Sequence, residues 1–125
     1  MAQISSHRDL RFWQEAISLV EECYRLATAC PKDELFGLSS QLKRAAVSVP
    51  ANISEGFGRG STGSDIQLLK IARGSLCEIE THLVLVIRLR LVEKPAVDKA
   101  MATRDRVAKL LHSLIISLDR RSIEE

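Results

Sequence analysis

The sequence predicts an all-α protein, an up-and-down antiparallel bundle of four long helices. Three observations lead to this prediction. Apolar residues recur every three or four positions along four successive segments, as they do on one face of a helix. The links between these segments are short, which favours antiparallel neighbours. The chain also has only 6 glycines and 3 prolines in 125 residues, too few for a sandwich or barrel with many tight turns.

A chain of this length is expected to form one domain. We expect the bundle to span residues 9–121, between a disordered N-terminal tail at 1–8 and a C-terminal tail at 122–125. The four helices are predicted at about 9–29, 36–59, 64–91 and 96–121. Hydrophobic residues make up 46% of the chain and charged residues 27%, which is typical of a soluble globular protein. Aromatic residues make up only 4%, so the core must be mostly Leu, Ile, Val and Ala.

The chain carries no recognisable signal for secretion or membrane insertion. Its first residues, MAQISSHRDLRFW, lack an apolar segment, and no apolar run approaches the length that crosses a bilayer. Cys23, Cys30 and Cys77 show no CxxC spacing. Cys23 and Cys30 lie about two helical turns apart, beyond the reach of a disulfide. We therefore expect free thiols and a cytoplasmic protein with no membrane partner.

The first predicted helix, 9–29, can begin at Asp9, whose carboxylate can accept from free amides of the first turn. It ends at Cys30, because the following Pro31 disfavours a helical conformation there. Its apolar face is wider than packing against two neighbouring helices requires. This face comprises Phe12, Trp13, Ala16, Ile17, Leu19, Val20, Cys23, Tyr24, Leu26 and Ala27.

The second predicted helix, 36–59, contains Pro50. A proline inside a helix removes one backbone donor and costs about 3 kcal/mol. One interpretation is a single helix kinked at Pro50. The other is two shorter helices, the second capped by Ser48. We favour the kinked helix, because an apolar and a polar stripe both continue through the proline.

The polar stripe of this helix consists of Gln41, Arg44, Ser48, Asn52, Glu55 and Arg59. Candidate partners on the third helix are Ser75, Glu78 and His82. The stripe can be an inter-helix polar network, a solvated face, or a ligand or catalytic site. We favour the network, in which Arg44 pairs with Glu78 or Glu55, because buried charges are tolerated when paired. On that interpretation, Arg44→Ala destabilises the fold by a few kcal/mol.

The third predicted helix, 64–91, follows the glycine-rich stretch GFGRGSTG. That stretch follows no strand and lacks the Lys-Ser/Thr of a phosphate-binding loop, so we interpret it as a helix stop followed by a Ser or Thr cap. The helix is apolar over much of its circumference, which indicates contact with more than one neighbour. The fourth helix, 96–121, is expected to begin near Pro95 and to present one apolar face.

We find no catalytic constellation and expect no enzymatic activity, cofactor or metal. The nearest approach to a metal motif is Glu78 with His82 one turn later, and a hydrogen bond between the two is the simpler interpretation. The formal net charge of +2 gives no global case for nucleic-acid binding. Locally, basic residues without interleaved acids are candidate nucleic-acid contacts, the alternative being a solvated surface. These candidates are Arg59, Lys70, Arg73, Arg88 and Arg90.

Three stretches resemble the four-helix-bundle proteins called 23S rRNA-intervening sequence proteins. They are DLRFWQEAISLVEECYRL, FGLSSQLKRAAVSVPANISEGFGR and IARGSLCEIETHLVLVIRL. The resemblance covers about residues 9–121 and is most specific in QLKRAAVSVPANISEGFGR, followed by GSLCEIETHL. The matching motif positions are Gln41, Arg44, Ser48, Pro50, Asn52, Glu55, Gly56, Gly74, Ser75, Glu78 and Glu80.

The resemblance implies a ring-shaped homo-oligomer, with a pentamer as the expected count, and no enzymatic activity. The accessory variability determinant protein of diversity-generating retroelements, which pairs with a reverse transcriptase and binds nucleic acid through a basic surface, is similar in fold. We therefore expect a non-enzymatic homo-oligomer that acts by binding RNA or a nucleoprotein. The alternatives are a structural or protein-docking scaffold, and a ligand-binding bundle that uses the polar stripe.

Overall fold

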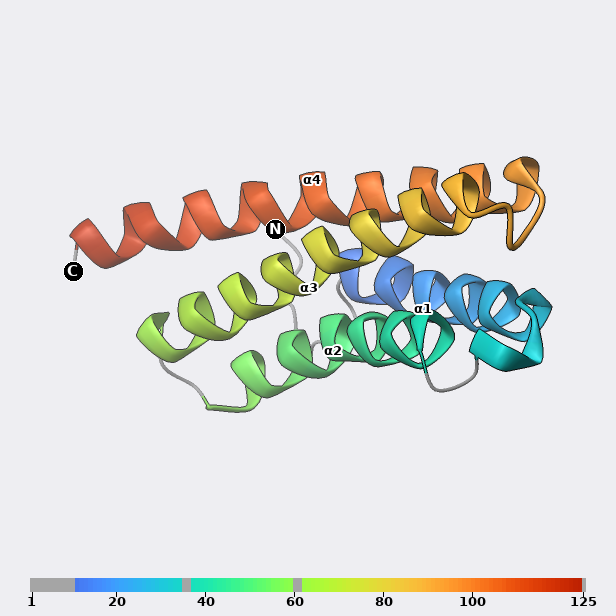
Figure 1. Cartoon of the computed structure of the whole chain (residues 1–125). Helices are drawn as coiled ribbons and strands as arrows, with labels where there is room; N and C mark the ends of the chain where they lie inside the picture. Colours follow the sequence, from blue (N-terminus) through green and yellow to red (C-terminus); the bar gives the residue numbers. More distant parts are fainter. Residues whose placement is uncertain (1–10, 35–36, 60–61, 125) are drawn as a thin grey trace.

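The computed structural model describes residues 11–34, 37–59 and 62–124. Within these residues the chain forms four α-helices and a short 3-10 helix, and no strand. The elements are α1 (Arg11–Ala29), η2 (Lys32–Glu34), α2 (Leu38–Arg59), α3 (Thr62–Arg88) and α4 (Lys94–Glu124). Consecutive α-helices run in opposite directions (Figure 1). The predicted all-α, up-and-down bundle is therefore confirmed, whereas the predicted tail at 1–8 lies outside the described residues.

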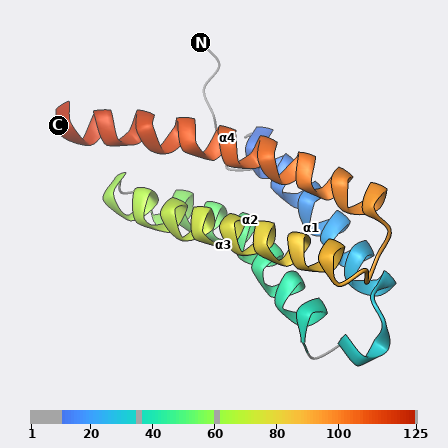
Figure 2. The same ribbon diagram turned by 45° about the horizontal axis from the view of Figure 1, so that its top comes forward.

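The four helices are arranged so that each packs against two others. The contacts join α1 with α2, α2 with α3, α3 with α4, and α4 back to α1, while helices on a diagonal do not pack among the described residues. With 19 residues α1 is the shortest of the four α-helices, and with 31 residues α4 is the longest. The C-terminal part of α4 consequently extends beyond the beginning of α1 (Figures 1 and 2).

The core lies between all four helices and consists mostly of aliphatic side chains, as the low aromatic content predicts. Each helix contributes residues three or four positions apart, which form one face of a helix. The largest fully buried side chains are Leu19, Leu42, Val49, Ile53, Leu69, Leu76, Ile79, Leu83, Val86, Val97, Val107 and Leu111. In the described part of the chain, no helix combines the length and the apolar composition that crossing a bilayer requires.

The helix α2 continues without interruption through Pro50, which is itself buried. The alternative of two separate helices is therefore wrong. Proline has no N–H, so the carbonyl of Ala46 loses its helical donor at this point. Packing of the apolar residues on both sides of Pro50, such as Val49 and Ile53, offsets that loss. A kink at Pro50 stays a prediction.

The helices α2 and α3 share the most extensive contact in the bundle. Small residues lie along this contact. Gly56 is buried, and a methyl group at its Cα would lie 3.5 Å from the Cα of Asp65. Ala45 and Ala72 are buried as well. Small side chains let two helix backbones approach closely, so polar groups of α2 and α3 can reach one another.

The end of α3 shows why the predicted limit of residue 91 is wrong. The helix ends at Arg88, and the backbone N–H of Leu91 then donates to the Val86 carbonyl at 3.0 Å. The N–H of Arg90 donates to the Ile87 carbonyl, also at 3.0 Å. Arg90 has a φ of 56°. This is the Schellman arrangement that closes many helices, here with arginine at the left-handed position that usually holds glycine.

The limits of α4 also differ from the prediction. The helix begins at Lys94, and Pro95 occupies its first turn, where the missing N–H has no helical partner to lose. It continues to Glu124, so the predicted C-terminal tail at 122–125 is wrong for residues 122–124. The last six helical residues, DRRSIE, contain neither glycine nor proline, and nothing in them stops a helix.

Candidate functional site

The polar stripe of α2 meets α3 at Ser48. The hydroxyl of Ser75 donates to Ser48 Oγ at 2.8 Å, and Asn52 Nδ2 donates to the same oxygen at 2.9 Å. Asn52 Nδ2 also lies 2.7 Å from the Ser48 carbonyl oxygen. Because Ser48 Oγ accepts from both neighbours, its own proton remains available to a further acceptor. Three of the eight residues predicted as a polar network are therefore joined by hydrogen bonds.

Beside these hydroxyls, a hollow of about 410 Å³ opens between α2 and α3. We call it the α2–α3 groove. Its lining residues are Gln41, Arg44, Ala45, Ser48, Ser75 and Glu78. Five of these six belong to the predicted polar network, which the fold thus gathers around one space.

The predicted burial of Arg44 is wrong. Arg44 is exposed, and in the described part of the chain it makes no ion pair with Glu78 or Glu55. Gln41, Glu55 and Glu78 are exposed as well. Arg44 and Glu55 lie at the outer edge of the α2–α3 contact, where solvent hydrates them, whereas the small polar residue Ser48 lies between the helices.

His82 is buried, with 9% of its surface exposed, and its Nδ1 has no hydrogen-bond partner in the described structure. The expected hydrogen bond between Glu78 and His82 therefore does not form there. Among the described residues, no group of three or more His, Cys, Asp or Glu side chains is arranged to hold a metal ion.

A second polar contact, between α3 and α4, was missed by the sequence analysis. The side chain of Arg104 is only 12% exposed. Its Nη1 donates to the Leu76 carbonyl at 3.1 Å, and its Nη2 lies 3.2 Å from Glu80 Oε2. Its Nε donates to Asp105 Oδ1 at 3.0 Å. Arg104 lies four residues after the buried Ala100, and that helical spacing was the signal available in the sequence.

A third polar contact joins α1 and α4. Arg106 Nε donates to Glu15 Oε1 at 3.2 Å, and its Nη2 donates to Thr103 Oγ1 at 3.1 Å. The Thr103 hydroxyl lies 3.2 Å from Glu22 Oε1. Thr103 is 2% exposed and lies on the apolar face of α4, between Ala100 and Val107. Arg104 and Arg106 thus hold α4 against its two neighbours, α3 and α1.

The predicted nucleic-acid contacts do not form one cluster. Lys70, Arg73 and Arg88 are exposed on α3. Lys70 and Arg88 are separated by five helical turns, so they share one side of α3 but lie about 27 Å apart along its axis. Arg90 is exposed in the turn after α3, and the side chain of Arg59 lies outside the described residues.

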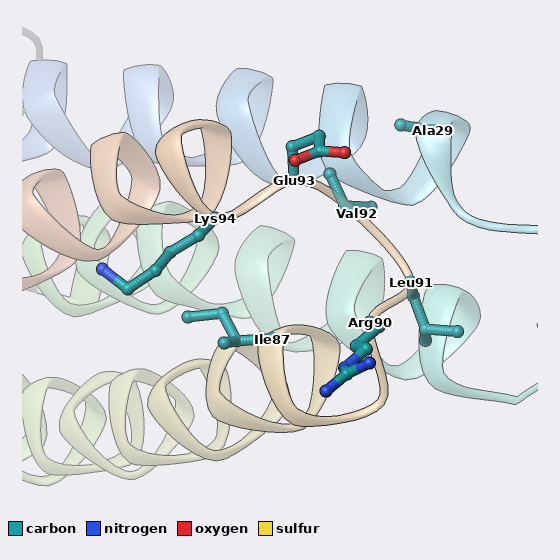
Figure 3. A pocket seen from close by; sticks show the side chains of 7 residues that line it. All are labelled: Ala29, Ile87, Arg90, Leu91, Val92, Glu93 and Lys94. Atoms are coloured by element: carbon teal, nitrogen blue, oxygen red, sulfur yellow. The ribbon is translucent and has the colours of Figure 1, made fainter.

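Arg90 contributes to a hollow of about 510 Å³ at the turn between α3 and α4 (Figure 3). Its lining residues are Ala29, Ile87, Arg90, Leu91, Val92, Glu93 and Lys94. The side chain of Lys94 extends along the first turn of α4, where Nζ lies 2.9 Å from Asp98 Oδ2. Glu93 and Asp98 offset the charge of the two cations, so this hollow presents no strong positive field.

The three cysteines are free thiols in the structure. Cys23 and Cys30 are buried and Cys77 is exposed. Burial, with a smaller contribution from the neighbouring Glu22 carboxylate, raises the pKa of Cys23 to about 12. Cys23 is therefore a core residue without thiolate character near neutral pH.

The fold and the α2–α3 groove define an antiparallel four-helix-bundle protein with polar contacts between its helices. The chain belongs to the 23S rRNA-intervening sequence protein family, whose sequence profile matches residues 8–113. The solved structure of a protein with unknown function from the S23 ribosomal protein family of Bacteroides thetaiotaomicron is similar, with a TM-score of 0.77 and 25% sequence identity. The match covers 83% of this chain and 94% of that one. No curated protein matches the chain.

Proposed function

We propose that the protein is a non-enzymatic, cytoplasmic homo-oligomer that acts by binding RNA or a nucleoprotein. The observation that carries the oligomer is the presence of apolar side chains exposed on two different faces of the protomer. A bundle of four helices needs only one apolar stripe per helix, and large exposed apolar patches mark contact surfaces. The pentameric count and the likeness to the accessory variability determinant protein stay predictions from the sequence motifs.

The first patch lies on the outer side of the α1–α2 pair. Ile17, Tyr24 and Val47 are 36%, 42% and 42% exposed. Two contacts show which residues of α1 and α2 lie side by side here. Lys43 Nζ lies 5.3 Å from the centre of the Tyr24 ring, and Trp13 Nε1 donates to Ser54 Oγ at 3.0 Å. Between these contacts, Ile17 and Tyr24 lie along α1. Val47 lies one turn from Lys43 on α2.

The second patch lies on the outer side of α3 and its following turn. Its members are Ile71, Leu85 and Leu89, which share one side of α3, and Leu89 is 58% exposed. Two unlike patches on one protomer favour head-to-tail association, in which the first patch of one copy contacts the second patch of the next. Such contacts generate a ring when the rotation closes.

Light scattering coupled to size-exclusion chromatography tests the ring. Val47→Lys on the first patch and Leu85→Lys on the second patch are each expected to reduce the particle to a monomer. Mixing the two variants should restore one contact and give a heterodimer, since each retains one intact patch. Ser113→Lys, at an exposed polar position of α4 that belongs to neither patch, is the matched control. A monomeric wild-type protein would refute the oligomer.

The RNA-binding part of the proposal is supported by the family name and by the exposed cations of α3. Phosphate contacts act additively, so a ring would multiply the contribution of Lys70, Arg73 and Arg88. Electrophoretic mobility shifts with structured RNA, at low and moderate salt, test this. The triple change of these residues to Gln should weaken the shift. Absence of any shift at micromolar protein would favour the alternative, a protein-docking scaffold, for which a pull-down should yield a protein partner.

A further inference from the structure

We propose that the α2–α3 groove binds a small zwitterion, a molecule with one carboxylate and one ammonium group and the size of an amino acid or a dipeptide. This inference goes beyond the proposed function, because the ligand is assigned from the charges and hydroxyl groups of the groove itself. Glu78 lies seven residues from both Ile71 and Leu85 on α3, so a contact at the second patch would border the groove. It rests on the charges, the hydroxyl groups and the open space that the two helices bring together.

The first argument is the pair of opposite charges on opposite walls. Arg44 comes from α2 and Glu78 from α3, and both line the groove. They are not close enough to form an ion pair with each other, and the described residues give neither of them another hydrogen bond or ion pair. A guanidinium binds a carboxylate through two parallel hydrogen bonds, and a carboxylate accepts from an ammonium group. The groove therefore offers one partner for each charge of a zwitterion.

The second argument is the charge balance, which selects the class of ligand. A simple anion at Arg44 would also meet the Glu78 carboxylate, and a simple cation at Glu78 would meet the Arg44 guanidinium. Either ligand would gain one attraction and suffer one repulsion. A zwitterion oriented with its carboxylate toward Arg44 gains both attractions. Ala45 is the one apolar lining residue, and its small side chain leaves room between the walls.

The third argument is the hydrogen-bonding capacity beside the charges. Ser48 Oγ accepts from Ser75 and Asn52, so the Ser48 proton is free to point into the groove. Ser48 lies one helical turn after Arg44, on the same side of α2, and a carboxylate bound by Arg44 can accept that proton. The side-chain amide of Gln41, one turn before Arg44, can form a hydrogen bond with a polar group between the two charged ends of the ligand.

Nearby, His82 presents a buried nitrogen that the described protein does not satisfy. It lies seven residues after Ser75 on α3, and Gln41 lies seven residues before Ser48 on α2. Because the two helices are antiparallel and Ser48 contacts Ser75, His82 and Gln41 lie at the same end of the groove. Buried polar atoms normally have a hydrogen-bond partner. A ligand or its bound water at this end would supply one.

Isothermal titration calorimetry with L-alanyl-L-alanine and with L-alanine, on the intact protein in whatever oligomeric state it adopts, tests the proposal. At least one of the two zwitterions should bind. N-acetylation, which removes the ammonium charge, and amidation of the carboxylate should each weaken binding about tenfold or more, as expected for the loss of one charged hydrogen bond.

Arg44→Gln and Glu78→Gln should weaken binding of the unmodified zwitterion by a similar factor. Both residues are exposed, so these variants are expected to fold. Arg120→Gln, an exposed position of α4 that does not line the groove, is the matched control and should bind as the wild type does. No heat at millimolar zwitterion, or equal binding by the blocked compounds or by the two groove variants, would overturn the proposal. Particle size and RNA shifts are measured separately. Loss of zwitterion binding with unchanged particle size and RNA shifts overturns this proposal alone, whereas a monomer that still binds the zwitterion overturns the oligomer alone.

Discussion

Replacement of Arg104 by alanine is expected to destabilise the bundle, because this side chain holds α4 against α3. The guanidinium donates to the Leu76 carbonyl on α3 and contacts Glu80 on the same helix. Only 12% of the side chain is exposed, so its aliphatic stem is packed as well. The substitution removes these contacts together. Near Arg104, α3 and α4 are then joined by apolar packing alone.

The size of the loss in the free energy of unfolding depends on the groups that Arg104 contacts and on how well water can replace it there. A hydrogen bond that involves a charged group contributes about 1.5–3 kcal/mol. The Glu80 and Asp105 side chains are 55% and 56% exposed, so solvent screens their pairing to about 0.2–1 kcal/mol each. After the substitution, water can hydrate both carboxylates, and the Leu76 carbonyl remains within a helix. We therefore expect a loss of about 2–3 kcal/mol in the free energy of unfolding, near the lower end of the combined range.

Urea unfolding followed by circular dichroism, at one fixed protein concentration, measures this loss. Arg44→Ala is the matched control, since Arg44 is exposed and unpaired in the described structure, and its effect should stay within about 0.5 kcal/mol. Arg104→Lys keeps the charge but not the forked geometry, and it should fall between wild type and Arg104→Ala. If Arg104→Ala proves as stable as Arg44→Ala, the assignment of Arg104 as an inter-helix contact is refuted.

Four further predictions concern the core, a glycine and the thiols. Ile79→Ala should lower the free energy of unfolding by about 2–5 kcal/mol, since Ile79 is fully buried, and a smaller loss in urea unfolding would contradict its place in the core. Gly74→Ala should raise the free energy of unfolding by up to about 1 kcal/mol, because Gly74 lies inside α3 with nothing within 4 Å of an added methyl group. A lower melting temperature would show that the added methyl group meets a neighbouring group. Cys77 should react with a thiol reagent at pH 8 before Cys23 does, and equal rates would argue against the burial of Cys23. Above pH 9 the unfolded thiol of Cys23 releases its proton, whereas the folded thiol retains it up to about pH 12, so stability should fall as the pH rises through this window.

The fold could be predicted from the sequence because helical periodicity is a local property. Apolar residues three or four positions apart define the buried face of each helix wherever its neighbours lie. The same continuity of apolar positions, from Val49 to Ile53, indicated that α2 continues through Pro50. The helix limits were less well determined. The end of α3 depends on Arg90 adopting a conformation that glycine usually adopts, which residue type alone does not predict.

The polar residues show where the sequence was insufficient. Arg44 and Ser48 are one turn apart on the same side of α2, and periodicity cannot distinguish them. In the structure the short hydroxyl of Ser48 meets Ser75, whereas the longer Arg44 side chain reaches past the contact into solvent. On α4, helical spacing relates Arg104 to the buried Ala100, but only the structure shows that α3 covers its side chain.

The sequence by itself determined the number of helices, their order, their buried faces and the family to which the chain belongs. Only the tertiary structure decided which polar side chains lie between helices, and that Arg44 and Glu78 face one groove without pairing. The physical reason is that the spacing along a helix fixes the direction in which a side chain points. The burial and the partners of that side chain depend on how closely the neighbouring helix packs, and on which residues of that helix lie opposite.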